Sequence, residues 1–506
     1  MKGRWKKVGN HLAIQCDNQI FHLDGGEVFS ILSGRGQEFL GDIEYPDLEA
    51  SFDGVDFSQI GSELKCVLAN DEHNEISLSL CCFREDDMVP VDVIQGQIID
   101  QCMTDKEWFY VSGNTEEVAK LFKELDIKDQ GRINVSQYIK LIKAGEGLLN
   151  TTIINHVKSN LLDKPIGENK NLPDGLQASL YEYQKVGYFW MSYMLSENTG
   201  CVLADEMGLG KTLQVIAVIL SYTHEKKVPM LVVAPVSLLQ NWKRECEKFA
   251  PEIKVLIHHG SQRTGNYRSL ENYDLVVTSY SAVVSDASLL KMIDWKLVIL
   301  DEAQNIKNPD SARAKFVKKI PKEGCIAITG TPFENHMTDL WSLTDFVSPG
   351  LLGTKSEFET AFPDDQEGAE ALEPIITPLM IRRLVKDVGS DLPEKIIISQ
   401  PLEMSDIEAI RYEDYREQIS NSCGENPTLA TLQKLRMYCT HPLLCDAAEN
   451  NNPAKNSIKY QRLIEIMEEI VASEEKVILF TSYQKMFDIL TEDIPERFDI
   501  PVWTIN

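Results

Sequence analysis

The sequence from about residue 176 onward predicts an α/β fold in which helices cover both faces of a parallel sheet. Short runs rich in β-branched residues alternate there with longer amphipathic stretches. Strands that alternate with helices in this way form parallel sheets. We expect strands over Cys201–Ala204, Met230–Ala234, Leu275–Thr278, Leu297–Leu300 and Ile326–Thr329, and helices over Leu213–Tyr222, Leu238–Phe249, Ala282–Met292 and Asp339–Phe346.

We place this lobe at residues 176–395, and the sequence patterns before and after it differ from its own. Residues 1–165 predict a mixed α+β accessory region, and residues 166–175, within a stretch rich in Pro, Gly and Asn, predict a linker. Residues 396–506 predict a helical insertion and the start of a second α/β lobe. One strand and its helix cannot form a doubly wound sheet, so we expect the chain to be a fragment. The elements expected outside the first lobe are strands at His11–Cys16, Ile76–Phe83 and Lys476–Thr481, and helices at Val118–Leu125, Gln137–Ile142, Ser405–Ile419, Thr428–Met437, Ile458–Ala472 and Gln484–Thr491.

The composition limits the class of protein. Hydrophobic residues make up 43% of the 506 residues and charged residues 25%, as in globular proteins. A formal net charge of −28 argues against a protein that coats nucleic acid through bulk charge, but it leaves room for a locally basic groove. No stretch approaches the ~20 apolar residues that span a bilayer, so we expect a soluble protein without membrane contact.

Two patterns superficially resemble metal sites. Cys439, His441 and Cys445 are three potential zinc ligands, but they lack a second cluster. Residues 126–137 resemble a calcium loop of the EF-hand type, yet Lys128 stands where an oxygen ligand is needed and the twelfth position carries an amide instead of a carboxylate. We expect neither metal, reduced cysteines throughout, and a plain connection between two helices at residues 126–137.

Residues 205–212, with the sequence Asp-Glu-Met-Gly-Leu-Gly-Lys-Thr, predict a phosphate-binding loop between a strand and a helix. A helix N-terminus directs unsatisfied backbone N–H groups at an anion, and Gly208 and Gly210 permit a close approach. Lys211 is expected to bridge the phosphates and Thr212 to ligate Mg²⁺. The strict pattern G-x-x-x-x-G-K-[ST] requires Gly where this chain has Asp205.

Two further strands end in residues that suit nucleotide chemistry. Asp301 and Glu302 follow an apolar run, where Asp301 would hold Mg²⁺ and Glu302 would orient and deprotonate the attacking water. A carboxylate pair alone is often a solvated turn, but its order after the phosphate loop favours nucleotide hydrolysis. The small hydroxyl residues of Thr329–Pro332 could sense the γ-phosphate and pass its loss to a neighbouring surface.

The ordered motifs resemble those of the helicase-like ATPases of superfamily two, specifically the SWI/SNF-type double-stranded DNA translocases, in a form more typical of bacteria. Asp205 is normal in that family's phosphate loop. The resemblance covers about Leu176 to the end, with an adenine-recognition segment around Gln184, motif Ia at Ala234–Trp242, motif Ib at Thr278–Tyr280, motif II at Asp301–Gln304, motif III at Thr329–Pro332, a link between lobes at Met380–Arg383 and Asp391–Lys395, a helical insertion at Lys434–Pro442 and motif IV at Val477–Thr481.

The resemblance implies a RecA-like first lobe, an incomplete second RecA-like lobe, ATP and Mg²⁺ as cofactors, duplex DNA as partner, and a cytoplasmic, nucleoid-associated protein. The residues that it assigns are Gln184, Asp205, Glu206, Met207, Gly208, Leu209, Gly210, Lys211 and Thr212 for ATP, Thr212 and Asp301 for Mg²⁺, Lys211, Asp301 and Glu302 for catalysis, Thr329, Gly330 and Thr331 for coupling, and Pro235, Thr278, Ser279, Tyr280, Arg382 and Arg383 for DNA.

The family's motifs V and VI would follow motif IV, and motif VI supplies an arginine that completes the ATP site. Such an arginine is worth about 10³–10⁵ in rate in related phosphoryl-transfer enzymes. We therefore expect this chain to bind ATP but to hydrolyse it slowly, and its full-length parent to be stimulated by DNA. Two alternatives stay open: a remodeller of RNA polymerase or of phage-defence complexes, and a nucleotide-dependent binding module without motor activity. The oligomeric state and the direction of movement do not follow from the sequence.

Overall fold

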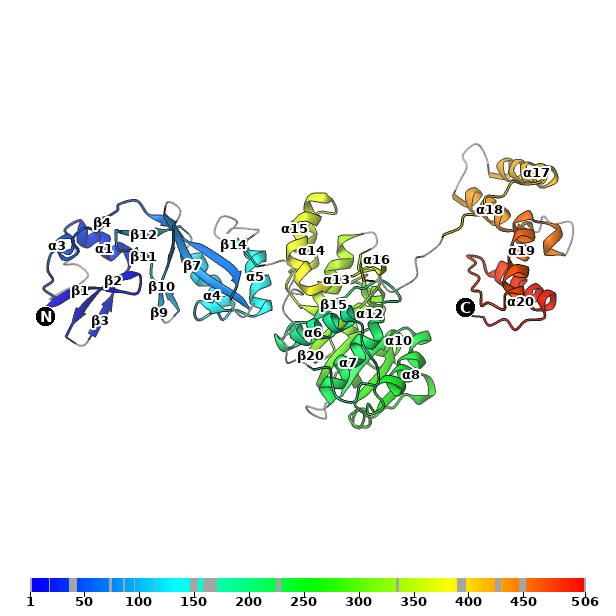
Figure 1. The fold of residues 1–506 in the computed structure, drawn as a ribbon, viewed down its shortest axis with the longest axis horizontal. Helices are drawn as coiled ribbons and strands as arrows, with labels where there is room; N and C mark the ends of the chain where they lie inside the picture. The colour runs from blue at the N-terminus through cyan, green and yellow to red at the C-terminus, as the bar shows by residue number, and fades with distance from the viewer. Residues whose placement is uncertain are drawn as a thin grey trace. The chain divides into compact units, whose positions relative to one another are not determined.

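A computed structural model describes residues 2–504 except 18, 36–42, 72–74, 85–86, 95, 114, 146–152, 158–170, 224–228, 334–335, 389–396, 424–428 and 446–451. The chain forms two compact units, Met1–Asp391 and Leu392–Asn506 (Figure 1). Residues 166–170, half of the expected linker, and the whole of the Asp391–Lys395 motif lie outside the described residues.

The accessory region at the N-terminus mixes small sheets with short helices, as the sequence predicts. A three-stranded antiparallel sheet has the order β1-β2-β3, and further sheets have the orders β11-β12-β4 and β13-β7-β6-β14. Buried Gln101 cross-links this region, because its amide donates to the Leu12 and Leu23 carbonyls and its oxygen accepts from Trp108. The elements are β1 Gly3–Val8, β2 His11–Cys16, β3 Gln19–His22, α1 Gly25–Leu32, α3 Leu48–Ser51, β4 Asp56–Phe57, β5 Ser62–Glu63, β6 Lys65–Asn70, β7 Ile76–Arg84, β8 Asp87–Pro90, β9 Val93–Ile94, β10 Gln97–Ile98, β11 Gln101–Met103, β12 Glu107–Ser112, α4 Thr115–Glu124, β13 Gly131–Arg132, α5 Val135–Gly145 and β14 Ile153–Asn155.

A seven-stranded sheet, parallel throughout, forms the centre of the following lobe. Its order is β17-β18-β16-β19-β20-β15-β21. All five strands expected from the sequence are present, and two strands were not expected: β17 at one edge and β21 at the other. The strands are β15 Cys201–Leu203, β16 Met230–Ala234, β17 Val255–His258, β18 Leu275–Ser279, β19 Trp295–Leu300, β20 Lys322–Ile328 and β21 Met380–Ile381.

Both faces of this sheet are buried under helices. Along β16, Met230 and Val232 point into one hydrophobic core, whereas Leu231 and Val233 point into the other. The first core contains α6 Glu182–Ser196, α7 Lys211–Thr223 and α8 Leu239–Phe249, and the second contains α10 Tyr280–Ser285, α11 Ala287–Leu290, α12 Ala312–Lys318 and much of α13 Met337–Val347. The helices α9 Tyr267–Leu270, α14 Lys355–Ala361, α15 Gln366–Ile376 and α16 Val385–Val388 complete the lobe. This arrangement confirms the predicted α/β class.

The helix expected over Ala282–Met292 is divided in two. It breaks at Asp286, which ends α10 and caps the start of α11. The Asp286 carboxylate is bound to His258 Nε2 at 2.9 Å and to Arg263 at 2.6 Å. These two bonds hold the residue outside helical geometry, which the hydrophobic pattern of the sequence does not report.

The second unit consists of helices around a small core that contains Leu444, Tyr460 and Met486. Its helices are α17 Asp406–Cys423, α18 Leu429–Thr440, α19 Ile458–Ala472 and α20 Gln484–Phe498. The strand expected at Lys476–Thr481 is wrong for this structure, because the segment has no hydrogen-bonded neighbour strand among the described residues of the unit. Ile478 is 77% exposed there and Phe480 is 93% exposed.

The two metal-like patterns have structural explanations. Residues 126–137 join α4 to α5, as expected, and the short strand β13 between them pairs with β7. His441 accepts from the Leu443 backbone N–H and its other ring nitrogen lies 3.0 Å from the Pro453 carbonyl oxygen. Among the described residues, no group of three or more His, Cys, Asp or Glu side chains gathers as a metal site. None of the helices in the described part of the chain combines the length and the apolar character that crossing a bilayer requires.

Replacing Met191 on α6 by alanine tests the buried helix layer. Met191 is 0% exposed, so we expect the free energy of unfolding to fall by about 2–5 kcal/mol. Met292 is 62% exposed, and Met292→Ala should change the free energy of unfolding by no more than about 0.5 kcal/mol. Urea unfolding followed by tryptophan fluorescence measures both, and equal losses would contradict the burial of α6.

Candidate functional site

The loop between β15 and α7 has the geometry of an anion cradle. Gly208 and Gly210 have φ angles of +93° and +70°, which L-residues with side chains rarely adopt. A Cβ atom at Gly210 would also lie 2.4 Å from the amide nitrogen of Gln184. The loop leads directly into α7, whose N-terminal residue is Lys211. Backbone N–H groups at this helix start can therefore face a phosphate.

Side chains packed behind the loop hold it in place. Gln184 is buried, donates to the Leu209 carbonyl at 3.2 Å and accepts from the Tyr181 backbone N–H. Gln214 on α7 donates to the Leu209 carbonyl and to the Asp205 carboxylate, both at 3.3 Å. A Cβ atom at Gly187 would lie only 2.0 Å from the Gln214 amide oxygen, so a glycine there lets α6 approach. Gln184, expected to contact adenine, thus also supports the phosphate loop.

Asp205, the departure from the strict loop pattern, has a specific partner. Its side chain is fully buried and forms a two-point ion pair with Arg383. The guanidinium also donates to the Gln214 amide oxygen at 2.8 Å and to the Tyr183 carbonyl. Arg383, expected to contact DNA, therefore faces inward against the phosphate loop, whereas Arg382 beside it is exposed.

Lys211 lies where the phosphate loop meets the carboxylates of motif II. Its ammonium donates to the backbone carbonyls of Asp205 at 2.8 Å and Glu206 at 3.3 Å. Burial lowers the pKa of this ammonium, and the negative charges of Glu302, Asp205 and Asp301 oppose that shift. A Cβ atom at Gly330 would lie 3.8 Å from Lys211 Nζ. The phosphate loop and motifs II and III therefore meet around this lysine.

Asp301, which follows β19, is oriented by residues at the starts of helices α8 and α10 and by the next backbone N–H. Its Oδ2 accepts from the indole N–H of Trp242 at 2.7 Å, and its Oδ1 accepts from the Glu302 backbone N–H at 3.0 Å. The Tyr280 hydroxyl donates to the Asp301 carbonyl at 2.8 Å. Burial raises the pKa of the Asp301 carboxyl, while the bond from Trp242 lowers it. A residue of motif Ia thus holds the Asp301 carboxylate, and a residue of motif Ib holds its backbone carbonyl.

A chain of side-chain hydrogen bonds connects motif II with motif III. Gln304 donates to the Glu302 carboxylate at 2.7 Å and accepts from the Thr329 hydroxyl at 2.9 Å. The Thr329 hydroxyl in turn accepts from the Thr331 backbone N–H. Glu302 itself has φ +48°, a conformation that non-glycine residues adopt chiefly at functional sites and turns. The geometry therefore links the expected general base to the expected coupling residues.

The donors at this edge suit Mg²⁺ better than a transition metal. Asp301 offers a carboxylate and Thr212 a hydroxyl, and both are hard oxygen ligands. Magnesium sites of this kind use one or two protein oxygens together with substrate phosphates rather than a full protein cage.

The residues expected to touch DNA divide into buried and accessible ones. Thr278, Ser279 and Tyr280 are at most 3% exposed, and their hydroxyls bond to groups inside the lobe. Contact between these side chains and DNA would require the lobe to open. Pro235 is half-buried at the end of β16, and Arg382 is exposed.

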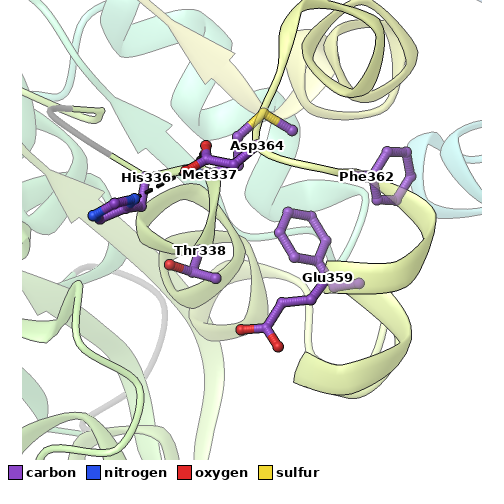
Figure 2. A pocket seen from close by; sticks show the side chains of 7 residues that line it. His336, Met337, Thr338, Glu359, Phe362 and Asp364 are labelled. Carbon is purple, nitrogen blue, oxygen red and sulfur yellow. Dashed lines mark hydrogen bonds and ion pairs between the residues drawn. The ribbon is translucent and has the colours of Figure 1, made fainter.

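A separate cavity of about 280 Å³ lies at the start of α13, beside α14 and the loop before α15 (Figure 2). His336 Nδ1 and Asp364 Oδ2 are 2.9 Å apart at its rim, and Phe358 and Phe362 also line it. No residue of the phosphate loop lines this cavity.

A profile of the SNF2-related domain matches residues 183–444, which is more than half of the chain. The chain belongs to the SNF2-related family. The lobe that contains the phosphate loop is thus the first part of an SNF2-related domain, and the match continues into the second unit.

Bacterial relatives of this SNF2-related chain carry names that describe ATP-dependent enzymes. YwqA of Bacillus subtilis, named as an ATP-dependent helicase/translocase, is 33% identical over 363 residues, covering 67% of this chain and 39% of that protein. An uncharacterized ATP-dependent helicase of Mycoplasma pneumoniae is 35% identical over 63% of this chain and 32% of its own length. The chain therefore spans about a third to two fifths of these relatives. Among solved structures, the Sulfolobus solfataricus SWI2/SNF2 ATPase core in complex with double-stranded DNA is 36% identical over 65% of this chain and 73% of that chain, with a TM-score of 0.43.

Sequence reasoning did not identify two supporting residues of the SNF2-related lobe. Trp242 lies within the motif Ia segment, where an apolar residue type gives no sign that its N–H reaches Asp301. Gln214 lies on the buried side of α7, where its amide bridges Asp205 and Arg383. Only a polar residue within the apolar run of α7 hinted at Gln214.

Replacing Trp242 by phenylalanine should weaken Mg²⁺ binding. The change keeps an aromatic ring but removes the N–H that orients Asp301. Loss of such an outer contact typically costs about 10–100-fold in metal affinity. The measurement is the Mg²⁺ concentration needed for half-maximal binding of a fluorescent ATP analogue.

Trp295→Phe is the matched control for this substitution. Trp295 is equally buried and also loses one indole hydrogen bond, to the Leu290 carbonyl, but it lies at the start of β19 rather than at its carboxyl end. An equal Mg²⁺ shift in both variants would show that general destabilisation, not the orientation of Asp301, is responsible.

Proposed function

We propose that this chain is the ATP-binding part of a motor that couples ATP hydrolysis to movement along double-stranded DNA. The observation that carries the proposal is the convergence of Lys211, Asp301 and Glu302 at one edge of the sheet, with a hydrogen-bonded path from Glu302 to Thr329. A protein that only binds nucleotide needs the residues that converge at the sheet edge, but it does not need the hydrogen-bonded path from Glu302 to Thr329.

In the proposed reaction, Lys211 contacts the γ-phosphate, which is transferred. The backbone N–H groups of the phosphate loop face the adjacent β-phosphate. Thr212 and Asp301 would hold Mg²⁺, which when bound neutralises charge on the phosphate oxygens. Glu302 orients the attacking water and accepts its proton. Gln304 contacts both Glu302 and Thr329, so a change at the γ-phosphate alters the motif III loop.

The same lobe supports a role for duplex DNA through surfaces beside motifs Ia and Ib. Exposed Ser237, Gln240 and Ser281 follow the carboxyl ends of β16 and β18, and exposed Arg382 follows β21. Hydroxyl, amide and guanidinium groups are the usual donors to phosphate oxygens. Buried Tyr280 and Trp242 would pass a displacement of these surfaces to Asp301. Contacts to the backbone require local donors rather than net positive charge, so a net charge of −28 is compatible with this role.

We further propose that residues 176–395 form a complete RecA-like lobe and that residues 396–506 begin a second one. The division of the chain into compact units at Asp391 and Leu392 supports a boundary near residue 395.

Two substitutions test the ATP site. Lys211→Ala should weaken ATP binding by about 10–150-fold, the equivalent of one charge-assisted hydrogen bond of ~1.5–3 kcal/mol. Glu302→Gln should retain binding and lower single-turnover hydrolysis by about 10²–10⁴-fold, because it removes the general base. Exposed Lys291→Ala is the control and should match the wild type in both assays.

The DNA part of the proposal is tested on the full-length parent protein, because this chain alone is expected to hydrolyse ATP slowly. The same hydrolysis assay is run without DNA, with single-stranded DNA and with duplex DNA. Duplex DNA should give the fastest hydrolysis, and Glu302→Gln should remove the stimulation. Equal rates under all three conditions, with ATP binding intact, would favour a nucleotide-binding module over a translocase.

A further inference from the structure

The last strand of the lobe runs beside the phosphate loop before the chain leaves for the second unit. Strand β21 pairs in parallel with β15, with Met380 opposite Val202 and Ile381 opposite Leu203. The backbone contact continues beyond the strand, because Glu206 donates its N–H to the Arg383 carbonyl at 2.9 Å. The loop and this segment are therefore joined along their backbones.

Two loop carboxylates then bind the same segment through their side chains. Asp205 accepts from the Arg383 backbone N–H at 3.1 Å and from its guanidinium. Glu206 accepts from the Val385 backbone N–H at 2.7 Å, where α16 begins. Consecutive residues of the phosphate loop thus fix residues 383–385, which lie just before the second unit.

The ion pair between Asp205 and Arg383 is the strongest of these bonds and is shielded from water. Asp205 is fully buried, and the Arg383 side chain is only 12% exposed. Gln214 and the Tyr183 carbonyl occupy further guanidinium donors. Separating a buried pair leaves an uncompensated charge in an apolar environment, which is costly. The segment therefore cannot move away without distorting the loop.

We propose that Arg383 is a positioning residue that makes the start of the interlobe segment part of the nucleotide site. A nucleotide that orders the loop also orders residues 382–388, and a displacement of this segment weakens nucleotide binding by the same factor. The equality follows from thermodynamic linkage between two coupled equilibria. The inference rests on the proposed nucleotide binding, and it assigns to Arg383 a role in coupling rather than in contact with DNA.

Lys211 gives the coupling a second route. Its ammonium donates to the backbone carbonyls of Asp205 and Glu206, the two residues whose side chains hold the segment. A bound phosphate attracts the same ammonium and so acts directly on both residues. Nucleotide and interlobe segment therefore meet at Asp205 and Glu206 from opposite sides.

Hydrogen–deuterium exchange with and without Mg²⁺·ADP tests the proposal on the 506-residue chain, because an ATPase does not consume ADP. In the wild type, exchange should slow in residues 205–212 and, by about fivefold or more, in residues 382–388, as for two sites with ordinary coupling. In Arg383→Gln, exchange should still slow in residues 205–212, but the response of residues 382–388 should be clearly smaller than in the wild type, because only the bonds of Asp205 and Glu206 to backbone groups of residues 383 and 385 then join the two segments. Lys386→Gln removes a charge from the same segment at an exposed position and should keep both responses.

Each outcome bears on a different statement. A wild type that responds only in residues 205–212, or an Arg383→Gln variant that responds in both segments as strongly as the wild type, would overturn the coupling role. A wild type that responds in neither would instead reject nucleotide binding itself. Should circular dichroism show that Arg383→Gln is unfolded, the double variant Asp205→Asn with Arg383→Gln leaves no unpaired buried charge, and it should show the same reduced response in residues 382–388.

Discussion

The parallel direction of all seven strands is the constraint on which the chemistry of this lobe depends. Parallel strands end at one edge of a sheet, so β15, β16, β18, β19, β20 and β21 all deliver their following residues to the same side. The phosphate loop, Asp301, Glu302 and Thr329 are neighbours for that reason, although about 125 residues of chain separate the first from the last. No single segment carries the site, and its spacing is set by sheet order.

Hydrogen bonds between these segments, rather than the segments themselves, make the site rigid. Trp242 on α8 and Tyr280 on α10 both donate hydrogen bonds to Asp301, and Gln304 bonds to both Glu302 and Thr329. These bonds join the segments that follow β16, β18, β19 and β20. A carboxylate held on both oxygens needs little reorganisation when charge develops beside it, which is the physical basis of electrostatic catalysis.

The sequence predicts the parts of this lobe whose signal is local. Apolar runs locate β15, β16, β18, β19 and β20, and the glycines with Lys211 locate the phosphate loop. It does not predict β21, which has only two residues, and we did not expect β17, although Val255, Leu256 and Ile257 form an apolar run there. Nor does it reveal that Arg383 faces Asp205, since 178 residues separate them and an arginine beside an exposed Arg382 looks like a surface cation. The strand expected at Lys476–Thr481 fails for the opposite reason: its local pattern is sound, but a strand requires a partner.

The buried pair between Asp205 and Arg383 has a consequence for how such sequences can change over time. Glycine in place of Asp205 would leave the Arg383 charge buried without its partner. Loss of Arg383 would likewise leave the Asp205 carboxylate buried and unpaired. Either single substitution passes through a poorly stable intermediate, whereas the double substitution does not. The residues at positions 205 and 383 should therefore change together in evolution. The combination found at these two positions would then mark related sequences.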